Sequence, residues 1–520
     1  MPQLGPESAR SSSTATARRK NSSENLATAG VLILIAYAIF RSIFAAASKP
    51  FWYDEVLTVI LTRLPNVSAI WRALSQAADG QPPAFYLIER AASAVTRDPH
   101  IALRIPAIFA FACVLLCSFF FVRYRSGAPY ALLSTTALLL TVTYSTYAVE
   151  ARPYCMLVAC VAFVLHCYQR ASRTRWIILM GFGLMAAEAL HYYAVFVLFP
   201  LALAEIAFSV KTRRLRPTVW LAFAATFLPL VAFWPLLLRL KRYYGPHIWD
   251  PPTLRHAGGA YGWLLDMPAS VHPEVAAAVV LVLLGFFVAL AFRKVRTVSI
   301  RDPFFHEHVL LWALLALPIA AYAATKFAHG PFDRKYVLPV ALAIPLAVGY
   351  ILPRLSRAVV VLLAVLVLSV LATREVRFWT SQLGRFGDVK SPAAPLESSV
   401  NLAGHPELPV VVSDAVDYLS FVYYGSPGLA GRLVVVVDPS EEVAYVGSDS
   451  LDRNLISIRS FYPLRVYEFQ AFVAGHPRFL LYSDGTANDW WPRRLRTDGF
   501  SLAPVVSDQG RGIYLVSKGS

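Results

Sequence analysis

Residues 51–55 read Phe-Trp-Tyr-Asp-Glu and follow directly on a hydrophobic stretch at 27–48. Adjacent carboxylates are costly to hold beside a bilayer and are rarely needed for packing, so acids at membrane depth usually serve a function. A loop carrying Gln81-Pro82-Pro83 comes next, and many further hydrophobic stretches follow it. This layout indicates an enzyme that acts on a lipid-linked substrate at the outer face of a membrane.

The composition places the chain among the polytopic membrane proteins. Of its 520 residues, 57% are hydrophobic and 15% are charged, whereas soluble domains average about 45–50% apolar and about 25% charged residues. The formal net charge of +16 could suggest a nucleic acid partner. However, Lys and Arg occur in short clusters between apolar stretches, and no basic stripe lies on a soluble face. We therefore expect a lipid bilayer, and no nucleic acid, as partner.

Eleven stretches are long and apolar enough to span a membrane, which takes about 20 residues each. They lie at 27–48, 102–122, 128–147, 152–169, 175–190, 192–210, 218–238, 274–292, 307–325, 335–352 and 357–373. His191-Tyr192-Tyr193 must form the turn between the fifth and sixth spans. Residues 1–26 are rich in Ser, Thr, Ala and Arg and are predicted to be a disordered cytoplasmic tail. The first span is then an uncleaved signal anchor.

The distribution of basic residues sets the predicted orientation. Arg18-Arg19-Lys20 precede the first span, and every second loop after it is short and basic. Because such loops stay in the cytoplasm, the N-terminus is predicted inside and residues 374–520 outside. The loops that carry Asp54, Glu150, His191 and Lys335 then share the outer face. We expect a multi-pass protein of the inner (plasma) membrane.

The chain divides into a transmembrane domain at 27–373 and a soluble domain at 374–520. In the first outer loop, 49–100, Val67, Ile70, Trp71 and Leu74 recur at helical spacing, and a helix restarts at 84–95, which predicts two interfacial helices. Strand-like runs in the soluble domain, at 409–413, 433–438 and 478–483, alternate with helical stretches near 414–424, 451–475 and 488–497, and a hairpin over 500–506 and 512–517 closes the chain. The predicted fold is a mainly α polytopic bundle followed by an α/β domain with a mainly parallel sheet.

Asp54 is the candidate general base. In sugar transfer the acceptor hydroxyl loses its proton as it attacks the anomeric carbon, and a carboxylate commonly accepts that proton. A polyprenyl phosphate would leave as a stable anion, so no general acid is needed and cations must meet the phosphate. Glu55 could orient the acceptor or help to bind a divalent cation. The alternative is a structural role, in which the carboxylate at this helix end pairs with a nearby Arg.

Several cations could meet that phosphate. Arg152 opens the fourth span and could contact phosphate or pair with Glu150. Arg334 and Lys335 open the tenth span and could capture phosphate or extend to the lipid headgroups. Arg104, like Arg41, is an intramembrane cation that needs a carboxylate or phosphate partner. Polar side chains expected to line a substrate cavity are Tyr53, Glu150, Tyr154, His191, Tyr192 and Tyr336, although a His at a hairpin is more often a turn residue than a ligand.

The order of these motifs resembles that of the C-type glycosyltransferases over residues 25–375. The matching motifs are Trp-Tyr-Asp-Glu at 52–55, Pro-Pro-x-x-Tyr at 82–86, Leu-Arg-x-Pro at 103–106, Glu-x-Arg-Pro-Tyr at 150–154 and Arg-x-Tyr-x-x-Pro at 334–339. The resemblance is closest to the bacterial branch that includes protein O-mannosyltransferases and the lipid A aminoarabinose transferase.

The resemblance implies roles for several residues. Asp54 matches the proposed catalytic base of the family, with Glu55 as its acidic neighbour, and Arg334 belongs to the phosphate-facing wall. The donor would be a polyprenyl-phosphate sugar, and the acceptor a hydroxyl of a lipid, glycan or protein. One position departs from the family pattern. The residue before Pro-Pro is often His or Lys there, whereas Gln81 can hydrogen-bond to a phosphate but carries no charge.

Two other functions are compatible with the same features. A flippase or transporter of lipid-linked substrates typically shows internal repeats and broken paired helices, and no half-to-half repeat is visible in this sequence. A glycan polymerase or ligase shares the lipid-phosphate donor and differs in where its large outer loop falls. Formation of a sugar-transfer product by the purified chain separates an enzyme from a transporter.

Overall fold

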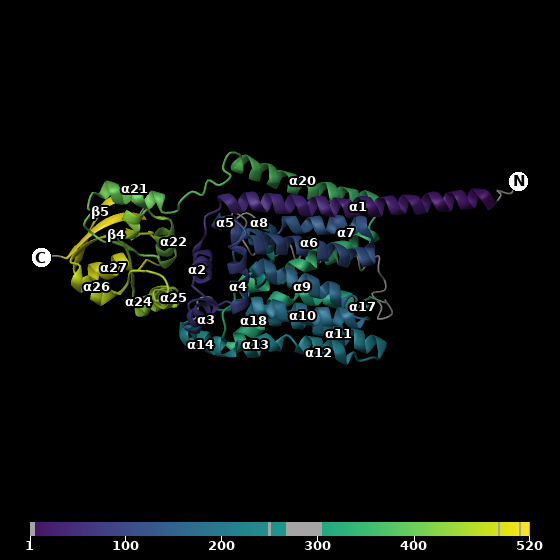
Figure 1. Cartoon of the computed structure of the whole chain (residues 1–520), viewed down its shortest axis with the longest axis horizontal. Helices are drawn as coiled ribbons and strands as arrows, with labels where there is room; N and C mark the ends of the chain where they lie inside the picture. Colours follow the sequence, from purple (N-terminus) through teal and green to yellow (C-terminus); the bar gives the residue numbers. More distant parts are fainter. Residues whose placement is uncertain (1–5, 248–250, 267–303, 487–488, 509–510, 519–520) are drawn as a thin grey trace.

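The fold is described from a computed structural model, for residues 6–247, 251–266, 304–486, 489–508 and 511–518. The molecule is elongated, with a helical bundle at one end and a mixed α/β domain at the other (Figure 1). The predicted span at 274–292 and the basic loop after it lie outside the described residues.

The bundle is formed by helices that run along the long axis of the molecule (Figure 1). Its elements are α1 (Pro6–Ser48), α6 (Ile105–Ser126), α7 (Ala128–Thr136), η1 (Ala137–Leu140), α8 (Val142–Ser145), η2 (Tyr147–Val149), α9 (Tyr154–Tyr168), α10 (Thr174–Leu190), η3 (Tyr192–Val197), α11 (Leu198–Thr212), α12 (Pro217–Ala224), α13 (Phe227–Ala232), α14 (Trp234–Tyr244), η4 (Gly245–His247), α15 (Leu254–Leu264), α17 (Phe305–Leu315), α18 (Leu317–Ala328), η5 (Arg334–Leu342), α19 (Ala343–Ile351), η6 (Leu352–Arg354) and α20 (Arg357–Gln382).

Within the described residues, every predicted span has a helix or a helix pair at its position. Five helical stretches are long and apolar enough to cross a membrane, at 22–48, 99–126, 192–212, 334–354 and 357–382. The shorter helices α9 and α10 occupy the predicted fourth and fifth spans, and His191, with extended backbone, forms the turn after α10.

Three predicted spans are bent rather than straight. The bends measure 62° within 128–149, 62° within 217–244 and 56° within 305–328. Pro235 and Pro318 stand in the first turn of the second helix in the latter two pairs. Proline lacks an N–H and clashes with the preceding turn, so it kinks a helix at that point. In the first pair, Thr141 has an extended backbone between η1 and α8.

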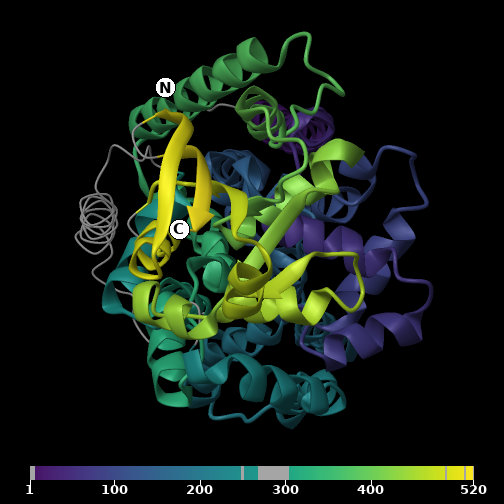
Figure 2. The same ribbon diagram turned by 90° about the vertical axis from the view of Figure 1, so that its left-hand side faces the viewer.

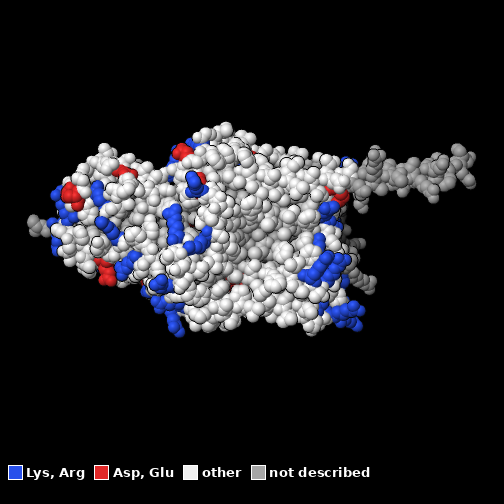
Figure 3. Space-filling view, in the orientation of Figure 1, with Lys and Arg blue, Asp and Glu red and all other residues white. Residues whose placement is uncertain are grey.

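The two ends of the membrane domain differ from the sequence expectation. α1 begins at Pro6, whereas residues 1–26 were expected to be disordered. Adding a residue to an existing helix is far easier than starting one, so the helix of the first span continues into this segment. α20 continues to Gln382, beyond the expected boundary at 373. Between the ends, Figure 3 shows a wide band of uncharged surface with Lys and Arg gathered on either side of it, as a bilayer requires.

The first outer loop folds into four short helices, α2 (Tyr53–Thr62), α3 (Val67–Ser75), α4 (Pro83–Ala92) and α5 (Pro99–Ala102). The two helices predicted here correspond to α3 and α4. Ile70 and Leu74 of the predicted stripe are buried, whereas Val67 and Trp71 are exposed. The sequence did not predict α2 as a separate helix. Its first turn holds Asp54 and Glu55, where carboxylates interact favourably with the helix dipole.

The C-terminal domain contains a six-stranded sheet in the order β3-β2-β1-β4-β6-β5. Its elements are α21 (Ala394–Ala403), β1 (Val410–Val412), α22 (Ala415–Tyr424), α23 (Pro427–Ala430), β2 (Leu433–Val437), α24 (Pro439–Tyr445), α25 (Ser450–Ile458), β3 (Val466–Glu468), α26 (Phe469–Gly475), β4 (Arg478–Ser483), α27 (Trp491–Thr497), β5 (Phe500–Asp508) and β6 (Arg511–Lys518). Strands β3, β2, β1 and β4 run parallel, and the hairpin β5–β6 adds to β4 antiparallel.

The predicted helix over 451–475 is wrong in its middle. There the chain forms α25, a loop through Pro463, the edge strand β3 and then α26. Proline cannot continue the helix, and the residue before it avoids helical backbone angles. The other predicted strands and the closing hairpin are confirmed.

One face of this sheet is joined to the first outer loop. Alternate residues of β2 point to opposite faces, so Leu433, Val435 and Val437 share one core with the helices on that side. The same core includes Phe51 and five apolar residues of α2. The domain therefore lies over the end of the bundle (Figure 2), with α2 in the joint between them.

Candidate active site

Glu55 forms a buried ion pair with Arg104. Its two carboxylate oxygens accept hydrogen bonds from Nε and Nη2 of Arg104, at 2.8 Å each, and both side chains are fully buried. Arg104 also donates to the carbonyls of Ala46, Lys49 and Pro50, at the end of α1. Burial opposes ionisation of Glu55, but the Arg104 guanidinium outweighs it and holds the pKa of this carboxyl below its usual value.

This pair ties together three of the five motifs named above, those at 52–55, 103–106 and 150–154. Glu55 also accepts from the backbone N–H of Ala151, at 2.8 Å. The end of span one, α2, the 103–106 motif and the 150–154 motif thus meet at one carboxylate. Every N–H-bearing nitrogen of Arg104 is engaged and both oxygens of Glu55 are occupied, which leaves neither group available to a phosphate or a divalent cation in this arrangement.

Arg152 bridges Asp79 and Asp54. Its Nη1 and Nη2 lie 2.6 Å and 3.3 Å from the two oxygens of Asp79, and its Nε lies 3.8 Å from Oδ2 of Asp54. Nη1 also donates to the backbone carbonyl of Asp54, at 3.2 Å. Burial opposes ionisation of Asp79, yet Arg152 holds the pKa of this carboxyl below its usual value.

Lys335 reaches Asp54 from the other side. Its Nζ lies 3.5 Å from Oδ2 of Asp54 and 3.2 Å from Oδ2 of Asp333. Lys335 comes from η5, which packs against α9, so the fourth and tenth spans converge on the first outer loop. The carboxylate of Asp54 is 19% exposed, whereas Glu55, Asp79 and Glu150 are each buried. Asp54 is therefore the most accessible of these four acids.

Aromatic rings lie beside Lys335. Nζ of Lys335 lies 5.4 Å from the ring centre of Trp52 and 5.5 Å from that of Tyr154. Tyr154, His191, Tyr193 and Tyr336 form a contiguous group, with Tyr193 and Tyr336 ring centres 4.3 Å apart. His191 Nδ1 accepts from the backbone N–H of Tyr193, as a turn residue does, and its Nε2 is buried without a hydrogen-bond partner.

Glu150 lies beside the same cluster. Its Oε1 accepts a hydrogen bond from the indole Nε1 of Trp52, at 2.7 Å. Burial, opposed by Lys49 and reinforced by Glu55 and Asp54, raises the pKa of Glu150 to about 7. A carboxyl of this kind changes its charge near neutral pH, next to the candidate base. The predicted alternative, a Glu150–Arg152 pair, is absent from the ion pairs of the described residues, and Asp79 takes that place.

The remaining predicted residues have other surroundings. Arg334 is half-buried, with its guanidinium 5.8 Å from the ring centre of Trp263. Gln81 is buried two residues after Asp79, and Tyr192 is half-buried on η3. Tyr53 is buried, and its hydroxyl donates to Oδ1 of Asn454 in the C-terminal domain. Arg41 has the carboxylate partner that its position required, Glu375, at 3.4 Å.

Asp79 is the site residue that the sequence analysis missed. Asp79-Gly80 reads as a turn before the prolines, and nothing in the local sequence distinguishes it from other turn residues. Among the described residues, no group of three or more His, Cys, Asp or Glu side chains is arranged to hold a metal ion.

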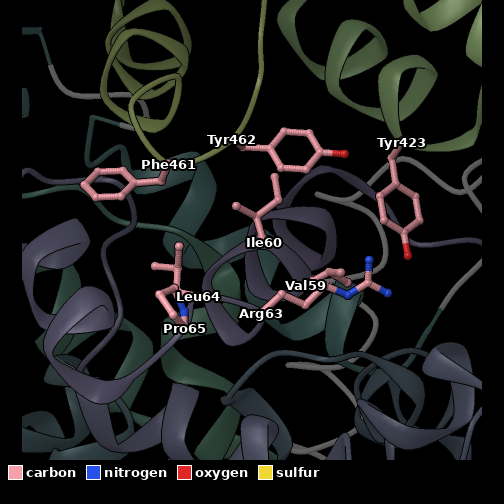
Figure 4. A pocket seen from close by; sticks show the side chains of 8 residues that line it. All are labelled: Val59, Ile60, Arg63, Leu64, Pro65, Tyr423, Phe461 and Tyr462. Atoms are coloured by element: carbon pink, nitrogen blue, oxygen red, sulfur yellow. The ribbon is translucent and has the colours of Figure 1, made fainter.

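A hollow of about 280 Å³ lies on the side of α2 that faces the C-terminal domain. Figure 4 shows its lining: Val59, Ile60, Arg63, Leu64, Pro65, Tyr423, Phe461 and Tyr462. It lies at the opposite end of α2 from Asp54, and thus apart from the cluster around Arg152.

No protein-family model and no curated protein matches the sequence. The solved structures that match the fold include ArnT from Cupriavidus metallidurans in the apo state and the same protein bound to undecaprenyl phosphate. The TM-scores are 0.54 and 0.53, at 14% sequence identity in both cases. The matches cover 94% and 93% of this chain and 98% and 97% of the ArnT chain. This chain has the ArnT fold.

The likeness to ArnT confirms the expected fold class, a polytopic helical bundle with a C-terminal domain. It also extends the resemblance that the motifs indicate. Those motifs cover residues 25–375, whereas the structural match to ArnT takes in nearly the whole chain, and therefore most of the C-terminal domain.

Proposed function

We propose that this protein is a membrane glycosyltransferase. It transfers a sugar from a polyprenyl-phosphate-linked donor to an acceptor hydroxyl, with Asp54 as the general base. The observation that carries the proposal is the position of Asp54. Its carboxylate is accessible and lies within 4 Å of the cations Arg152 and Lys335. The ArnT fold supports it, since one of the two ArnT structures holds undecaprenyl phosphate.

The proposed reaction is a displacement at the anomeric carbon. The acceptor oxygen forms a bond to that carbon while Asp54 takes the hydroxyl proton, and the bond between the carbon and the phosphate oxygen breaks. The phosphate keeps the electron pair and leaves as an anion. Lys335, Arg334 and Arg152 are the candidates to stabilise it, because preorganised cations act most strongly where charge develops in a water-poor site.

The cations in the cluster suit this task in different ways. Arg152 is held rigidly by Asp79, so its charge is fixed in place before the donor arrives. Lys335 lies against the rings of Trp52 and Tyr154. Because a Lys ammonium is a point charge on a flexible stem, it can turn from Asp54 towards a phosphate oxygen. Aromatic faces of this kind also pack against the apolar side of a sugar ring.

The orientation that we propose places this cluster on the outer side of the membrane. The N-terminus is then cytoplasmic, residues 27–373 form the membrane domain and residues 374–520 an extracytoplasmic domain. A periplasmically active reporter fused after Lys518 is expected to be active. A fusion at that point that is active only in the cytoplasm contradicts the orientation and places Asp54 in the wrong compartment.

The function is tested with the purified full-length chain in lipid nanodiscs. Undecaprenyl-phosphate-linked sugars and extracted cell-envelope lipids, glycans and proteins are supplied, and the products are analysed by mass spectrometry. Transfer of the sugar with release of undecaprenyl phosphate supports the proposal. Movement of the labelled donor across vesicles that contain the chain, without any transfer product, favours a flippase instead.

A further inference from the structure

We infer that the C-terminal domain positions two acids of the candidate active site, Asp54 and Asp79. Asn454 and Ser457 lie on one face of α25. Both donate hydrogen bonds to the backbone just before Asp79, and Asn454 also accepts one from Tyr53, the residue before Asp54. These contacts position both acids. The inference rests on the proposed function, in which Asp54 is the base. It assigns to these two residues of a separate domain a positioning role rather than contact with substrate.

Three consecutive carbonyls just before Asp79 are each held by a side chain from elsewhere in the chain. The carbonyl of Gln76 accepts from Oγ of Ser457 at 2.7 Å, and the carbonyl of Ala78 accepts from Nδ2 of Asn454 at 2.8 Å. Between them, the carbonyl of Ala77 accepts from the hydroxyl of Tyr244 at 2.7 Å. Two of the three donors belong to α25 of the C-terminal domain.

The backbone of this segment needs such support. Ala77 has a φ of 62°, in the left-handed region that residues other than glycine rarely adopt. Conformations of this kind persist when the surrounding structure over-determines them, and they concentrate at functional sites. Ala77 and Ala78 are buried, so a lost hydrogen bond there is not replaced by water. Asp79 follows directly, and its carboxylate fixes Arg152.

Asn454 makes a second contact that leads to the candidate base. Its Oδ1 accepts a hydrogen bond from the hydroxyl of Tyr53 at 2.7 Å, and both residues are buried. Tyr53 immediately precedes Asp54 at the start of α2. Nδ2 of Asn454 also lies 3.2 Å from the hydroxyl of Tyr244. A single amide, 7% exposed, thus joins the two backbone segments that carry Asp54 and Asp79.

The consequence for catalysis follows from this connection. If α25 releases its hold, the segment at 76–78 can relax, Asp79 shifts, and Arg152 no longer has a fixed position beside Asp54. Misplacement of a catalytic group by about 1 Å can cost about a hundredfold in rate. The fold of the bundle need not change, because the apolar core between α2 and the C-terminal domain remains in place.

The test compares single substitutions on α25 in the full-length protein. Asn454→Ala and Ser457→Ala each remove contacts to the 76–78 segment, and Tyr53→Phe removes one hydroxyl while keeping its ring. Leu451→Ala is the matched control, because Leu451 lies on the same helix and is 39% exposed. Two quantities are measured: sugar transfer, and amide hydrogen exchange of a peptide covering residues 73–81.

We expect Asn454→Ala to lower kcat at least tenfold, with faster exchange in that peptide and KM changed less than kcat. Ser457→Ala and Tyr53→Phe should act in the same direction with smaller effects. In an Asp79→Asn background, Asn454→Ala should cost less than about threefold, because residues that act through one contact are non-additive. Leu451→Ala should match wild type in both readouts.

The inference is overturned if exchange in the 73–81 peptide is the same in Asn454→Ala as in Leu451→Ala. It is equally overturned if transfer by Asn454→Ala and Ser457→Ala stays within twofold of wild type, or if the losses in the Asp79→Asn background are additive. A wild-type chain that transfers no sugar overturns the proposed function instead. The exchange result then decides by itself whether α25 anchors the segment before Asp79.

Discussion

Arg152 and Asp79 form a bidentate ion pair in the interior of the protein, with nitrogen–oxygen distances of 2.6 Å and 3.3 Å. Paired, planar contacts of this kind give geometric specificity as well as energy. They orient the remaining nitrogen of the guanidinium, Nε, towards Asp54. Asp79, which the sequence did not single out, thus fixes Arg152 beside Asp54, which it did.

Replacing Asp79 by Asn is expected to lower both stability and activity. The substitution keeps the shape but leaves the buried Arg152 without its closest carboxylate. Removal of one partner of a buried pair typically costs about 3–5 kcal/mol, and the nearby Asp54 should keep the loss at the lower end. Thermal unfolding of the detergent-solubilised protein measures this, with the exposed Asp388→Asn as control. An unchanged unfolding temperature contradicts the role assigned to Asp79.

Glu55 and Arg104 are expected to matter for folding more than for chemistry. Glu55→Gln or Arg104→Ala alone leaves a buried charge unpaired and should reduce the yield of folded protein. The double variant Glu55→Leu with Arg104→Met removes both charges and should recover part of that loss. The recovery should be incomplete, because the carbonyls of Ala46, Lys49 and Pro50 and the N–H of Ala151 lose their side-chain partners. Size-exclusion profiles and unfolding temperatures of the three variants measure the effect. A double variant that is no more stable than either single variant argues against mutual charge neutralisation as the main contribution of this pair.

Glu150 is expected to make stability depend on pH. Its pKa of about 7 in the folded protein lies above the usual value of 4.5, so the folded state binds this proton more tightly than the unfolded state. Its contribution to the free energy of unfolding is therefore fully present below pH 4.5 and is lost as the pH rises through 7. The total loss is about 3 kcal/mol. Relative to Glu150→Gln, which cannot ionise, wild type should melt lower at pH 8 than at pH 5.5. If the unfolding temperatures of the two proteins change with pH in the same way, Glu150 does not titrate in this range.

Arg334 and Lys335 are expected to bind the donor phosphate. Arg334→Ala should weaken binding of undecaprenyl phosphate, and Arg334→Lys should recover part of it, because a Lys cannot reproduce the two parallel hydrogen bonds of a guanidinium. Lys335→Ala should weaken binding as well, since its Nζ stands beside Asp54. Binding to the protein in nanodiscs is measured with undecaprenyl phosphate itself. Unchanged binding in both alanine variants places the phosphate elsewhere, and Arg152 is then the next cation to test.

Hydropathy alone predicted most of the architecture. Spans such as 102–122 and strands such as 433–438 are continuous apolar runs. A run of this kind can be buried in few ways, so its length predicts whether it forms a span or a strand. The bends at Pro235 and Pro318 were not predicted, because a proline in an apolar run can kink a helix or begin a new one.

The site was predicted less completely. Asp54, Arg152 and Lys335 stood out because charges next to hydrophobic spans are expensive, and the structure brings these three together. The sequence could not indicate that Glu55 is paired with Arg104 or that Asp79 holds Arg152. Both partnerships join residues far apart in the chain, and each depends on how α2 and the 76–83 segment fold against the bundle.

The central claim is that the carboxylate of Asp54 accepts the acceptor proton. The most direct test is the rate of sugar transfer by Asp54→Asn, measured beside its binding of undecaprenyl phosphate and its unfolding temperature. Loss of a general base should lower the rate by about 10²–10⁴, while binding and unfolding temperature stay near those of wild type. A rate within twofold of wild type in a correctly folded protein contradicts the claim and moves the base to another acid of the cluster, with Glu150 the first to examine.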